Sequence, residues 1–409
     1  MRPVVSQALR HGGGALMCLA AAACGGGGNA LSSSTPPVTP ASNVVSVVVD
    51  GGPAALAYAA VNTLYTTVTV CAPVTSTCQT IDNIQVDTGS YGLRLLATAL
   101  TLSLPVVAAA NGAALVECMP FADGYTWGPV SQVDVQISGE SASAVPVQLI
   151  GDPRYPTVPT DCSSTGPVAE DTVATFGANG ILGIGPFVYD CGSVCVTTAI
   201  PAAYYACTQA ACQNTTVPLA NQVLNPVTVF ARDNNGTIIT LPSVASGGAV
   251  SVTGSLIFGI DTESNNQSGT QTVLTIDPNS GYLTTIFNGQ TLSSSFVDSG
   301  SNSINFTDSS VTPCASNDFT GFYCPASTLT FSASLQGANG TSILESFSVA
   351  NAEAQANAEP TFTVVPDLGG VNPIAGSFDW GLPFFYGRRI ANAVEGNTTS
   401  AGTGPYVAF

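Results

Sequence analysis

The stretch NIQVDTGSYGLRLL, residues 83–96, places one carboxylate, Asp87, between an apolar, strand-like run and a turn of glycine and serine. A single Asp-Thr-Gly is weak evidence for a site, because aspartate and glycine are common in the turns that follow strands. The same pattern returns around Asp298 in SSFVDSGSNSINF, residues 294–306. Two copies in equivalent contexts indicate a duplicated unit with one aspartate in each half.

Each half carries a second shared element, an apolar run that contains glycine. It is GANGILGIGP at residues 177–186 in the first half and FDWGLPFFYGRR at residues 378–389 in the second. The order of the two elements is the same in both halves. The chain therefore resembles a lobe that occurs twice.

The composition fits two β-rich lobes with packed cores. The chain of 409 residues is 45% apolar and only 8% charged, with 12 tyrosines and 17 phenylalanines among many Val, Ile and Thr. We predict a first lobe over residues 44–225 and a second over residues 226–409. Residues 225–241 would carry the chain from one to the other.

The N-terminal 24 residues are typical of an export signal. Arg2 and Arg10 precede the short apolar run ALMCLAAAA, which ends at Cys24 and is too short to span a bilayer comfortably. LAAAAC followed by GGGG resembles a bacterial lipoprotein signal, which implies that Cys24 is lipidated and begins the mature chain. A plain secretory signal cut nearby is the alternative. Residues 25–43, rich in Gly, Ser and Pro, are expected to form a flexible tether.

The residue types that are missing exclude many mechanisms. The one histidine, His11, lies in the predicted signal, and the sequence contains no lysine. A Ser/His/Asp triad, a Cys/His pair, a lysine Schiff base and a histidine-ligated zinc are therefore excluded from the mature chain. A formal charge of -18 also argues against binding to nucleic acid or to an anionic membrane surface.

The cysteines are expected to pair, because an exported chain meets an oxidising compartment. Close spacing suggests Cys71 with Cys78 and Cys314 with Cys324, and Cys118 with Cys162 is a further candidate pair. Four cysteines remain: Cys191, Cys195, Cys207 and Cys212. They could form two disulfides or a four-thiolate zinc site, and an oxidising compartment favours the disulfides.

From about residue 44 to residue 409 the chain resembles the pepsin-like aspartic peptidases. NGILGIG is similar to their DGILGLG, and GSLIFGIDTESNN, residues 254–266, is similar to their LxFGGID. FDWGLPFFYGRRIANAVEG is similar to their LGDxFLRxxYxxFD, with Leu382 in place of the aspartate. The usual SNLW after the first motif is replaced by SYGLRL, which introduces the charged Arg94.

The resemblance implies a mainly β, two-lobed fold with a cleft between pseudo-symmetric lobes, and a catalytic pair formed by Asp87 and Asp298. Supporting roles fall on the residues that follow each aspartate. The Thr88 and Ser299 hydroxyls would cross-link the two loops. Gly89 and Gly300 would allow the neighbouring backbone to approach closely. Ser90 and Ser301 would orient the carboxylates by hydrogen bonds.

The family covers its cleft with a β-hairpin, the flap, that carries a tyrosine. ALVECMPFADGYTWGPVSQVDVQIS, residues 114–138, is the matching hairpin, and counting in register from Gly124 puts Phe121 at the tyrosine position. Tyr125 and Trp127 on the returning strand are candidates for the missing polar contact.

Two adjacent carboxylates share one proton over a wide pH range, so one pair supplies both an acid and a base. The sequence thus predicts an aspartic endopeptidase of the bacterial cell envelope that needs no cofactor or metal. It would act on a peptide or protein substrate as a monomer and meet the membrane only through its lipid anchor, on the periplasmic or surface face of the outer membrane. One alternative is a catalytically silent lipoprotein that binds a peptide or protein in the cleft. A two-carboxylate glycosidase is a weaker alternative.

Overall fold

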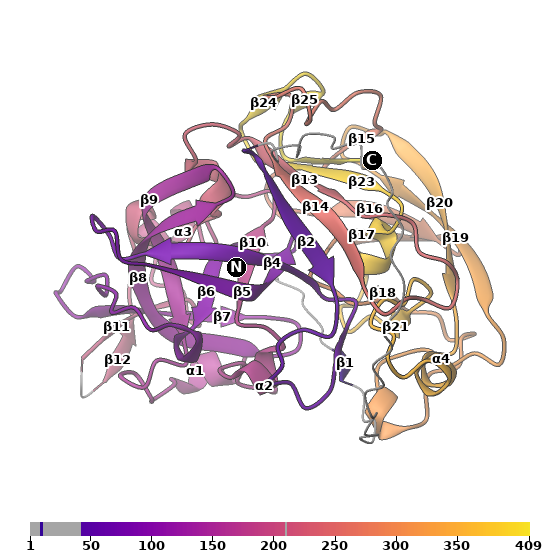
Figure 1. Cartoon of the computed structure of the whole chain (residues 1–409), viewed down its shortest axis with the longest axis horizontal. Coiled ribbons are helices and arrows are strands. Elements are labelled where there is room, and N and C mark those ends of the chain that lie inside the picture. Colours follow the sequence, from indigo (N-terminus) through magenta and orange to yellow (C-terminus); the bar gives the residue numbers. More distant parts are fainter. Residues whose placement is uncertain (1–8, 11–41, 209–210) are drawn as a thin grey trace, which may run out of the picture.

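The computed structural model describes residues 9–10, 42–208 and 211–409, and strands dominate it (Figure 1). The N-terminal half, indigo to magenta, and the C-terminal half, orange to yellow, form two lobes that lie side by side. The prediction of a mainly β, two-lobed fold is confirmed. Cys24 and nearly all of the predicted signal and tether lie outside the described residues. No helix in the described ranges is long and apolar enough to cross a membrane.

The largest sheet has 15 strands in the order β12-β11-β7-β8-β9-β6-β10-β5-β4-β2-β14-β13-β23-β26-β15. Its strands from the first half are β2 (Val44–Val49), β4 (Leu64–Cys71), β5 (Cys78–Asp87), β6 (Tyr91–Leu96), β7 (Ala114–Pro120), β8 (Tyr125–Ile137), β9 (Glu140–Ile150), β10 (Gly180–Ile184), β11 (Tyr204–Cys207) and β12 (Cys212–Asn214). Those from the second half are β13 (Gly236–Thr240), β14 (Val252–Phe258), β15 (Val273–Thr275), β23 (Arg389–Ala393) and β26 (Tyr406–Ala408).

A second sheet of seven strands belongs to the C-terminal half, in the order β20-β19-β16-β17-β22-β18-β21. Its strands are β16 (Leu283–Phe287), β17 (Gln290–Val297), β18 (Ile304–Phe306), β19 (Leu329–Gln336), β20 (Ser342–Val349), β21 (Gly369–Val371) and β22 (Asp379–Trp380). Two short pairs complete the strands: β1 (Leu9–Arg10) with β3 (Ala60–Val61), and β24 (Thr398–Thr399) with β25 (Gly402–Thr403).

The helices are short and lie between strands. The α-helices are α1 (Thr160–Ser163), α2 (Val173–Phe176), α3 (Ser193–Thr197) and α4 (Ala352–Ala358). The 3-10 helices are η1 (Ala97–Ala99), η2 (Leu219–Asn221), η3 (Pro226–Val229), η4 (Asn317–Phe319) and η5 (Leu382–Phe385).

The large sheet runs from one half of the chain into the other through β2. This strand pairs antiparallel with β14 from Val44 opposite Ile257 to Val49 opposite Val252, whereas only Val48 and Val49 pair with β4. β2, the first strand of the large sheet in chain order, is thus held mainly by the C-terminal half, as its place beside β14 in Figure 1 shows. The division into lobes at residues 225 and 226 remains a prediction.

The strands around each aspartate repeat one arrangement. In the first half, β10 lies parallel to β5, which ends at Asp87, and antiparallel to β6. In the second half, β22 lies parallel to β17, which ends just before Asp298, and antiparallel to β18. The duplication seen in the sequence is therefore a duplication of strand topology, and it places one aspartate in the same position of each repeat.

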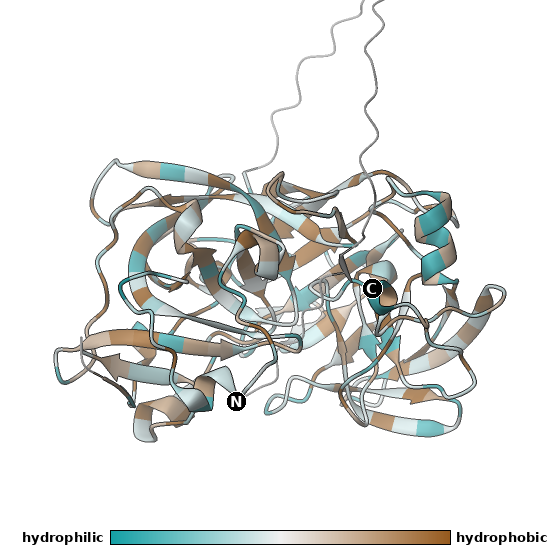
Figure 2. Ribbon diagram, turned by 90° about the horizontal axis from the view of Figure 1, so that it is seen from below, coloured by the Kyte–Doolittle hydropathy of each residue, from teal (hydrophilic) through white to brown (hydrophobic). Residues whose placement is uncertain are grey.

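Apolar residues are spread over the strands of both halves (Figure 2), and many of them are buried. One buried cluster extends from β2, β4 and β5 into the strands of the second half. In the C-terminal half this cluster is rich in aromatic rings, such as Phe306 stacked on Phe378 at 5.5 Å and Phe378 tilted on Trp380 at 4.6 Å. Aromatic pairs of this kind stabilise a core beyond the area that they bury.

Five disulfides join the described cysteines, and the predicted pairing is confirmed. The bonds are Cys71–Cys78, Cys118–Cys162, Cys191–Cys195, Cys207–Cys212 and Cys314–Cys324. The group of four thus forms two disulfides, as favoured. Disulfides in this number are typical of an exported protein.

The Cys118–Cys162 bond should stabilise the fold most, because its sequence separation of 44 residues is the largest of the five. We expect the double variant Cys118→Ser/Cys162→Ser to lose about 4 kcal/mol of unfolding free energy by loop-closure entropy. The matched control is Cys71→Ser/Cys78→Ser, with a separation of 7, for which about 2 kcal/mol is expected. Urea unfolding of both variants checks the order, and an equal or reversed loss would contradict it.

Candidate active site

The two motif loops meet face to face and exchange hydrogen bonds. The Thr88 amide donates to Ser299 Oγ at 3.1 Å, and the Ser299 amide donates to Thr88 Oγ1 at 2.9 Å. Each hydroxyl in turn donates to a carbonyl of the opposite half: Thr88 to Val297 at 3.1 Å and Ser299 to Val86 at 2.8 Å. The loops are fixed to each other by reciprocal bonds between buried groups.

The glycines that follow bring each loop against the opposite carboxyl group. A Cβ atom on Gly89 would lie 2.7 Å from Asp298 Cγ, and one on Gly300 would lie 2.4 Å from Asp87 Oδ1. No side chain fits at either position while the carboxyls stay in place. The structure therefore needs glycine at both positions for close approach.

The two carboxyl groups have parallel but unequal hydrogen bonds. Asp87 Oδ1 accepts from the Gly89 amide and Asp298 Oδ1 from the Gly300 amide, each at 2.7 Å. The Ser301 hydroxyl donates to Asp298 Oδ2 at 2.9 Å. Ser90 Oγ is buried near Asp87 and forms no normal hydrogen bond within the described residues. Asp87 Oδ2 accepts no hydrogen bond from those residues, and its carboxyl lies beside that of Asp298.

Burial raises the pKa of both groups, and the charges nearby act on the two pKa values in opposite directions. Burial raises the pKa of Asp298 well above its usual value, and the negative charges of Asp87 and Asp379 add to this effect. Burial also raises the pKa of Asp87, but hydrogen bonds from its neighbours and the positive charge of Arg94 oppose the rise. Because the surroundings differ in this way, Asp298 is the better place for a shared proton and Asp87 for the negative charge.

A third carboxyl group, Asp379 on β22, lies in the same charge cluster. It is 1% exposed, its Oδ2 accepts from Asn305 Nδ2 at 2.8 Å, and burial raises its pKa to about 7. Asp379 lies within the second shared element, residues 378–389, but had no predicted role. Its position as an acidic residue between two aromatic ones was the signal for it.

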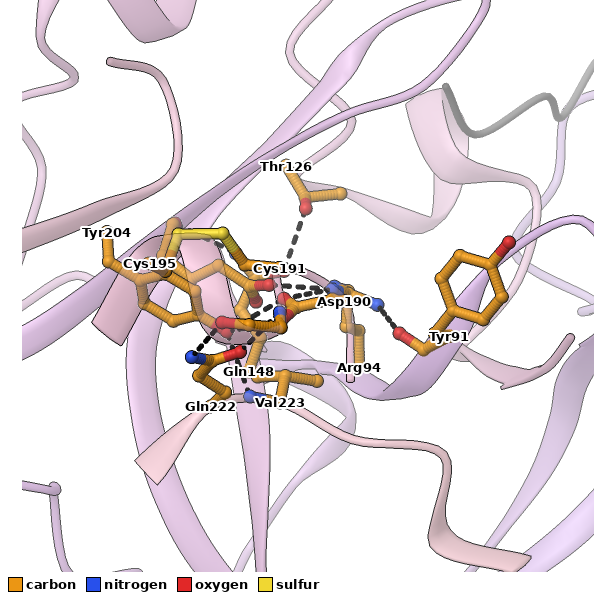
Figure 3. Close-up of polar contacts among 12 residues, drawn as sticks. Tyr91, Arg94, Thr126, Gln148, Asp190, Cys191, Cys195, Tyr204, Gln222 and Val223 are labelled. Carbon is orange, nitrogen blue, oxygen red and sulfur yellow. Dashed lines mark hydrogen bonds and ion pairs between the residues drawn. A yellow bond between two sulfur atoms is a disulfide. The ribbon is translucent and has the colours of Figure 1, made fainter. Parts of the chain in front are cut away.

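Arg94 lies at the centre of a buried network on the other side of Asp87, drawn in Figure 3. It is 0% exposed, its Nη1 donates to the Tyr91 carbonyl at 2.6 Å, and its Nη2 pairs with Glu117 at 2.6 Å and with Asp190 at 3.1 Å. Burial alone would lower the pKa of Arg94, but the two carboxylates outweigh it and raise that pKa. The network ties β6, which contains both Tyr91 and Arg94, to β7, which contains Glu117.

The acidic side of this network has its own polar contacts. The Tyr204 hydroxyl donates to Asp190, at 2.8 Å and 2.7 Å from its two oxygens. Burial, followed by the charge of Glu117, raises the pKa of Asp190 well above its usual value. Asp190 also precedes the disulfide Cys191–Cys195, which Figure 3 shows beside the Tyr204 ring.

The predicted flap hairpin is present as β7 and β8, and its tip is held against the N-terminal half. Phe121 is 4% exposed and packs edge-on against Phe176 of α2. The Tyr125 amide donates to the Val168 carbonyl, and the Glu170 amide donates to the Tyr125 carbonyl, both at 2.9 Å. These bonds join the tip to the segment that precedes α2.

The other two flap residues also contact the N-terminal half. Trp127 packs edge-on against Tyr205, and its Nε1 donates to the Tyr155 carbonyl at 2.9 Å. A Cβ atom on Gly124 would lie 2.6 Å from the Val168 carbonyl oxygen. The polar atoms of Trp127 are thus directed to the Tyr155 segment in this structure.

Both aspartates are closed off from solvent. Asp87 and Asp298 are each 0% exposed, and the cavity beside Thr88 and Gly89 has a volume of about 30 Å³. That volume is enough for one or two water molecules and far too small for a peptide. Tyr91, Tyr282 and Phe296 form part of its wall. A peptide would reach the pair only after some of these surroundings move.

The described residues include no group of three or more His, Cys, Asp or Glu side chains suited to hold a metal ion.

Fold and site together define a two-lobed, mainly β scaffold with an aspartate pair where the two halves meet. By its sequence the chain belongs to the family described as a protein of unknown function (DUF3443), whose model matches residues 39–409. Among solved structures it is similar to an aspartic proteinase from Irpex lacteus, with 16% identity and a TM-score of 0.48 over 89% of this chain and 96% of that one. No curated protein matches the chain.

Removal of the buried Arg94 charge should destabilise the protein strongly. Arg94→Met leaves Glu117 and Asp190 without their cation, and breaking a buried pair in this way costs about 3 to 5 kcal/mol. Arg154→Met is the matched control, because the Arg154 side chain is 54% exposed and its pair with Asp152 is worth about 0 to 1 kcal/mol. Urea unfolding at neutral pH measures both, and similar losses would contradict the role of Arg94.

The raised carboxyl pKa values predict that stability falls as the pH rises above about 4. The unfolded chain ionises these groups near their usual pKa of 3.8, whereas the folded chain retains the protons, so the native state binds more protons in this window. Asp379 alone, with a pKa of about 7, accounts for a loss of up to about 4 kcal/mol between pH 4 and pH 7.

Below this pH range, stability depends on carboxylates whose pKa values are lowered in the folded chain. Asp261 is one of them, because Ser400 and Ser268 donate hydrogen bonds to it. Their contribution is lost as the pH falls below about 4, so stability should be greatest near pH 4. Urea unfolding at a series of pH values tests this maximum. An unfolding free energy that increases steadily from pH 4 to pH 7 would contradict it.

Proposed function

We propose that the protein is an aspartic endopeptidase of the bacterial cell envelope. The observation that carries this proposal is the reciprocal arrangement of the two loops, in which each glycine lies against the carboxyl of the opposite half. This arrangement holds the two carboxyls against each other where the two halves meet, close enough to affect each other's pKa. The five disulfides are in keeping with an exported protein, and the lipid anchor at Cys24 remains part of the proposal.

The chemistry follows from the unequal surroundings of the two carboxyls. Asp87, whose negative charge Arg94 favours, would take a proton from a water molecule as that water attacks the peptide carbonyl carbon. Asp298, which retains its proton more strongly, would donate it toward the developing oxyanion. The proton gained by Asp87 would then pass to the leaving amine as the C–N bond breaks, and the proton given by Asp298 would return to it as the carbonyl re-forms. The reaction needs no covalent intermediate.

An extended peptide would lie between the lobes, with the β7–β8 hairpin above it. Backbone pairing with such a hairpin is a common way to recognise a peptide. In the structure the hairpin tip is bonded to residues 168–170 and the carboxyls are buried, so substrate entry requires the hairpin or a neighbouring loop to open.

The same burial favours one other function, a binding module without catalysis. A cleft that is closed over its aspartates, with Phe121 packed against Phe176, is also what a silent relative of the enzymes would show. In that case a peptide or protein would be held on the scaffold and released intact.

Cleavage of a denatured protein by the full-length protein in detergent, across about pH 3 to 8, tests the proposal. Asp87→Asn and Asp298→Asn should each lower the rate by at least about a thousandfold, because either change removes a member of a pair that acts as a unit. The exposed Asp318→Asn is the matched control and should retain the full rate. Absence of cleavage by the folded wild-type protein at every pH would reject the peptidase and favour the binding module.

A further inference from the structure

Asp379 is directed toward the aspartate pair by the strand that carries it. Its neighbours Phe378 and Trp380 are both 0% exposed and contact each other in the aromatic core at 4.6 Å. Successive side chains of a strand point to opposite faces, so Asp379 faces away from this core. In the parallel pair of β22 with β17, Asp379 lies opposite Phe296, and Asp298, two residues after Phe296, is on the same face as Asp379.

One hydroxyl group connects the third carboxyl to the pair. The Ser301 hydroxyl, which donates to Asp298 Oδ2 at 2.9 Å, also lies close enough to Asp379 to act on its charge. Asp379 Oδ2 is bonded to Asn305, while its Oδ1 is buried and has no hydrogen bond from the described residues. A serine hydroxyl has one proton to donate. The charge on Asp379 therefore determines whether Asp298 competes for that proton.

The charged groups around Asp379 are nearly all acidic. The strands that pair with β22 are β17 and β18, and neither contains a charged residue. The titratable groups that face Asp379 are thus Asp298 and, across the lobe interface, Asp87. The nearest cation that acts on the cluster is Arg94, which lies on the Asp87 side and is already paired with Glu117 and Asp190.

Three buried carboxyls without a cation of their own cannot all be ionised near neutral pH. We propose that Asp379 is a positioning residue that, once ionised, competes with Asp298 for the Ser301 hydroxyl, keeps Asp298 protonated by its negative charge and so extends the working range of the pair toward neutral pH. This inference rests on the proposed function for its effect on catalysis. Its effect on proton binding stands without that function.

The mechanism is a sharing of protons among three sites. As the pH rises, the first proton is lost from Asp87, whose charge is supported by Arg94. Each further ionisation then places a second negative charge beside the first, so Asp298 keeps its proton longer than it would in an isolated pair. A neutral residue at position 379 removes one source of repulsion, and Asp298 then loses its proton at lower pH.

The test is the pH profile of Asp379→Asn, measured as kcat/KM for peptide cleavage by the full-length protein. We expect the rate at about pH 7 to fall at least tenfold relative to wild type, while the rate at the optimum changes less than about threefold. A structural role alone would lower the rate at all pH values equally. Asp308→Asn, which removes one negative charge elsewhere in the same half, is the matched control and should leave the profile unchanged.

A second readout separates this inference from the proposed function. Carbon-13 NMR of aspartate-labelled protein follows the carboxyl groups of Asp87, Asp298 and Asp379 directly and needs no activity. In wild type at least one of them must titrate above about pH 5, and Asp298 must titrate at lower pH in Asp379→Asn. Asp379→Ser serves the same purpose if the asparagine variant does not fold.

The outcomes are decisive for each claim. A wild-type protein without activity, but with the expected shift in the Asp298 titration, would reject the peptidase and retain the role of Asp379. An unchanged Asp298 titration in a folded Asp379 variant, or a wild type in which none of the three carboxyls titrates above about pH 5, would overturn the inference.

Discussion

The hydrogen bonds exchanged by Thr88 and Ser299 are the contact on which the rest of the site depends. Each amide donates to a hydroxyl from the other half of the chain, and each hydroxyl donates to a carbonyl from that half. Buried polar groups must be paired, so neither loop has its native environment alone. This contact sets how the two loops meet, and Gly89 and Gly300 allow each loop to lie against the carboxyl of the other half.

Around this contact the charges are distributed unevenly. A chain with a formal charge of -18 buries one of its few arginines, Arg94, beside Asp87 and places another carboxyl, Asp379, beside Asp298. Each aspartate is followed by a nearly identical loop, yet the surroundings of the two aspartates favour opposite protonation states. A division of labour between acid and base thus arises from the neighbours of the motif and is absent from the motif itself.

Sequence reasoning was most successful where the information is local. The Asp-hydroxyl-Gly-Ser turns and the closely spaced cysteines are short patterns, and the repeated motif was enough to predict two β lobes with one aspartate each. The packing of Phe121 on Phe176 and the partners of Arg94 could not be predicted, because those contacts join segments far apart in the sequence. Asp379 was missed for the same reason: its direction follows from pairing between a two-residue strand and both β17 and β18.

The pairing of β2 with β14 affects the order in which the molecule can form. β2 cannot form its main pairing until residues 252–257 have been made and brought next to it. This requires closing a loop of about 200 residues. Contacts of such long range slow folding. Until they form, β2 is an unpaired edge rich in valine, the kind of segment that associates with other chains. The chain is therefore most prone to aggregate during synthesis, before the second half that contains β14 has been made.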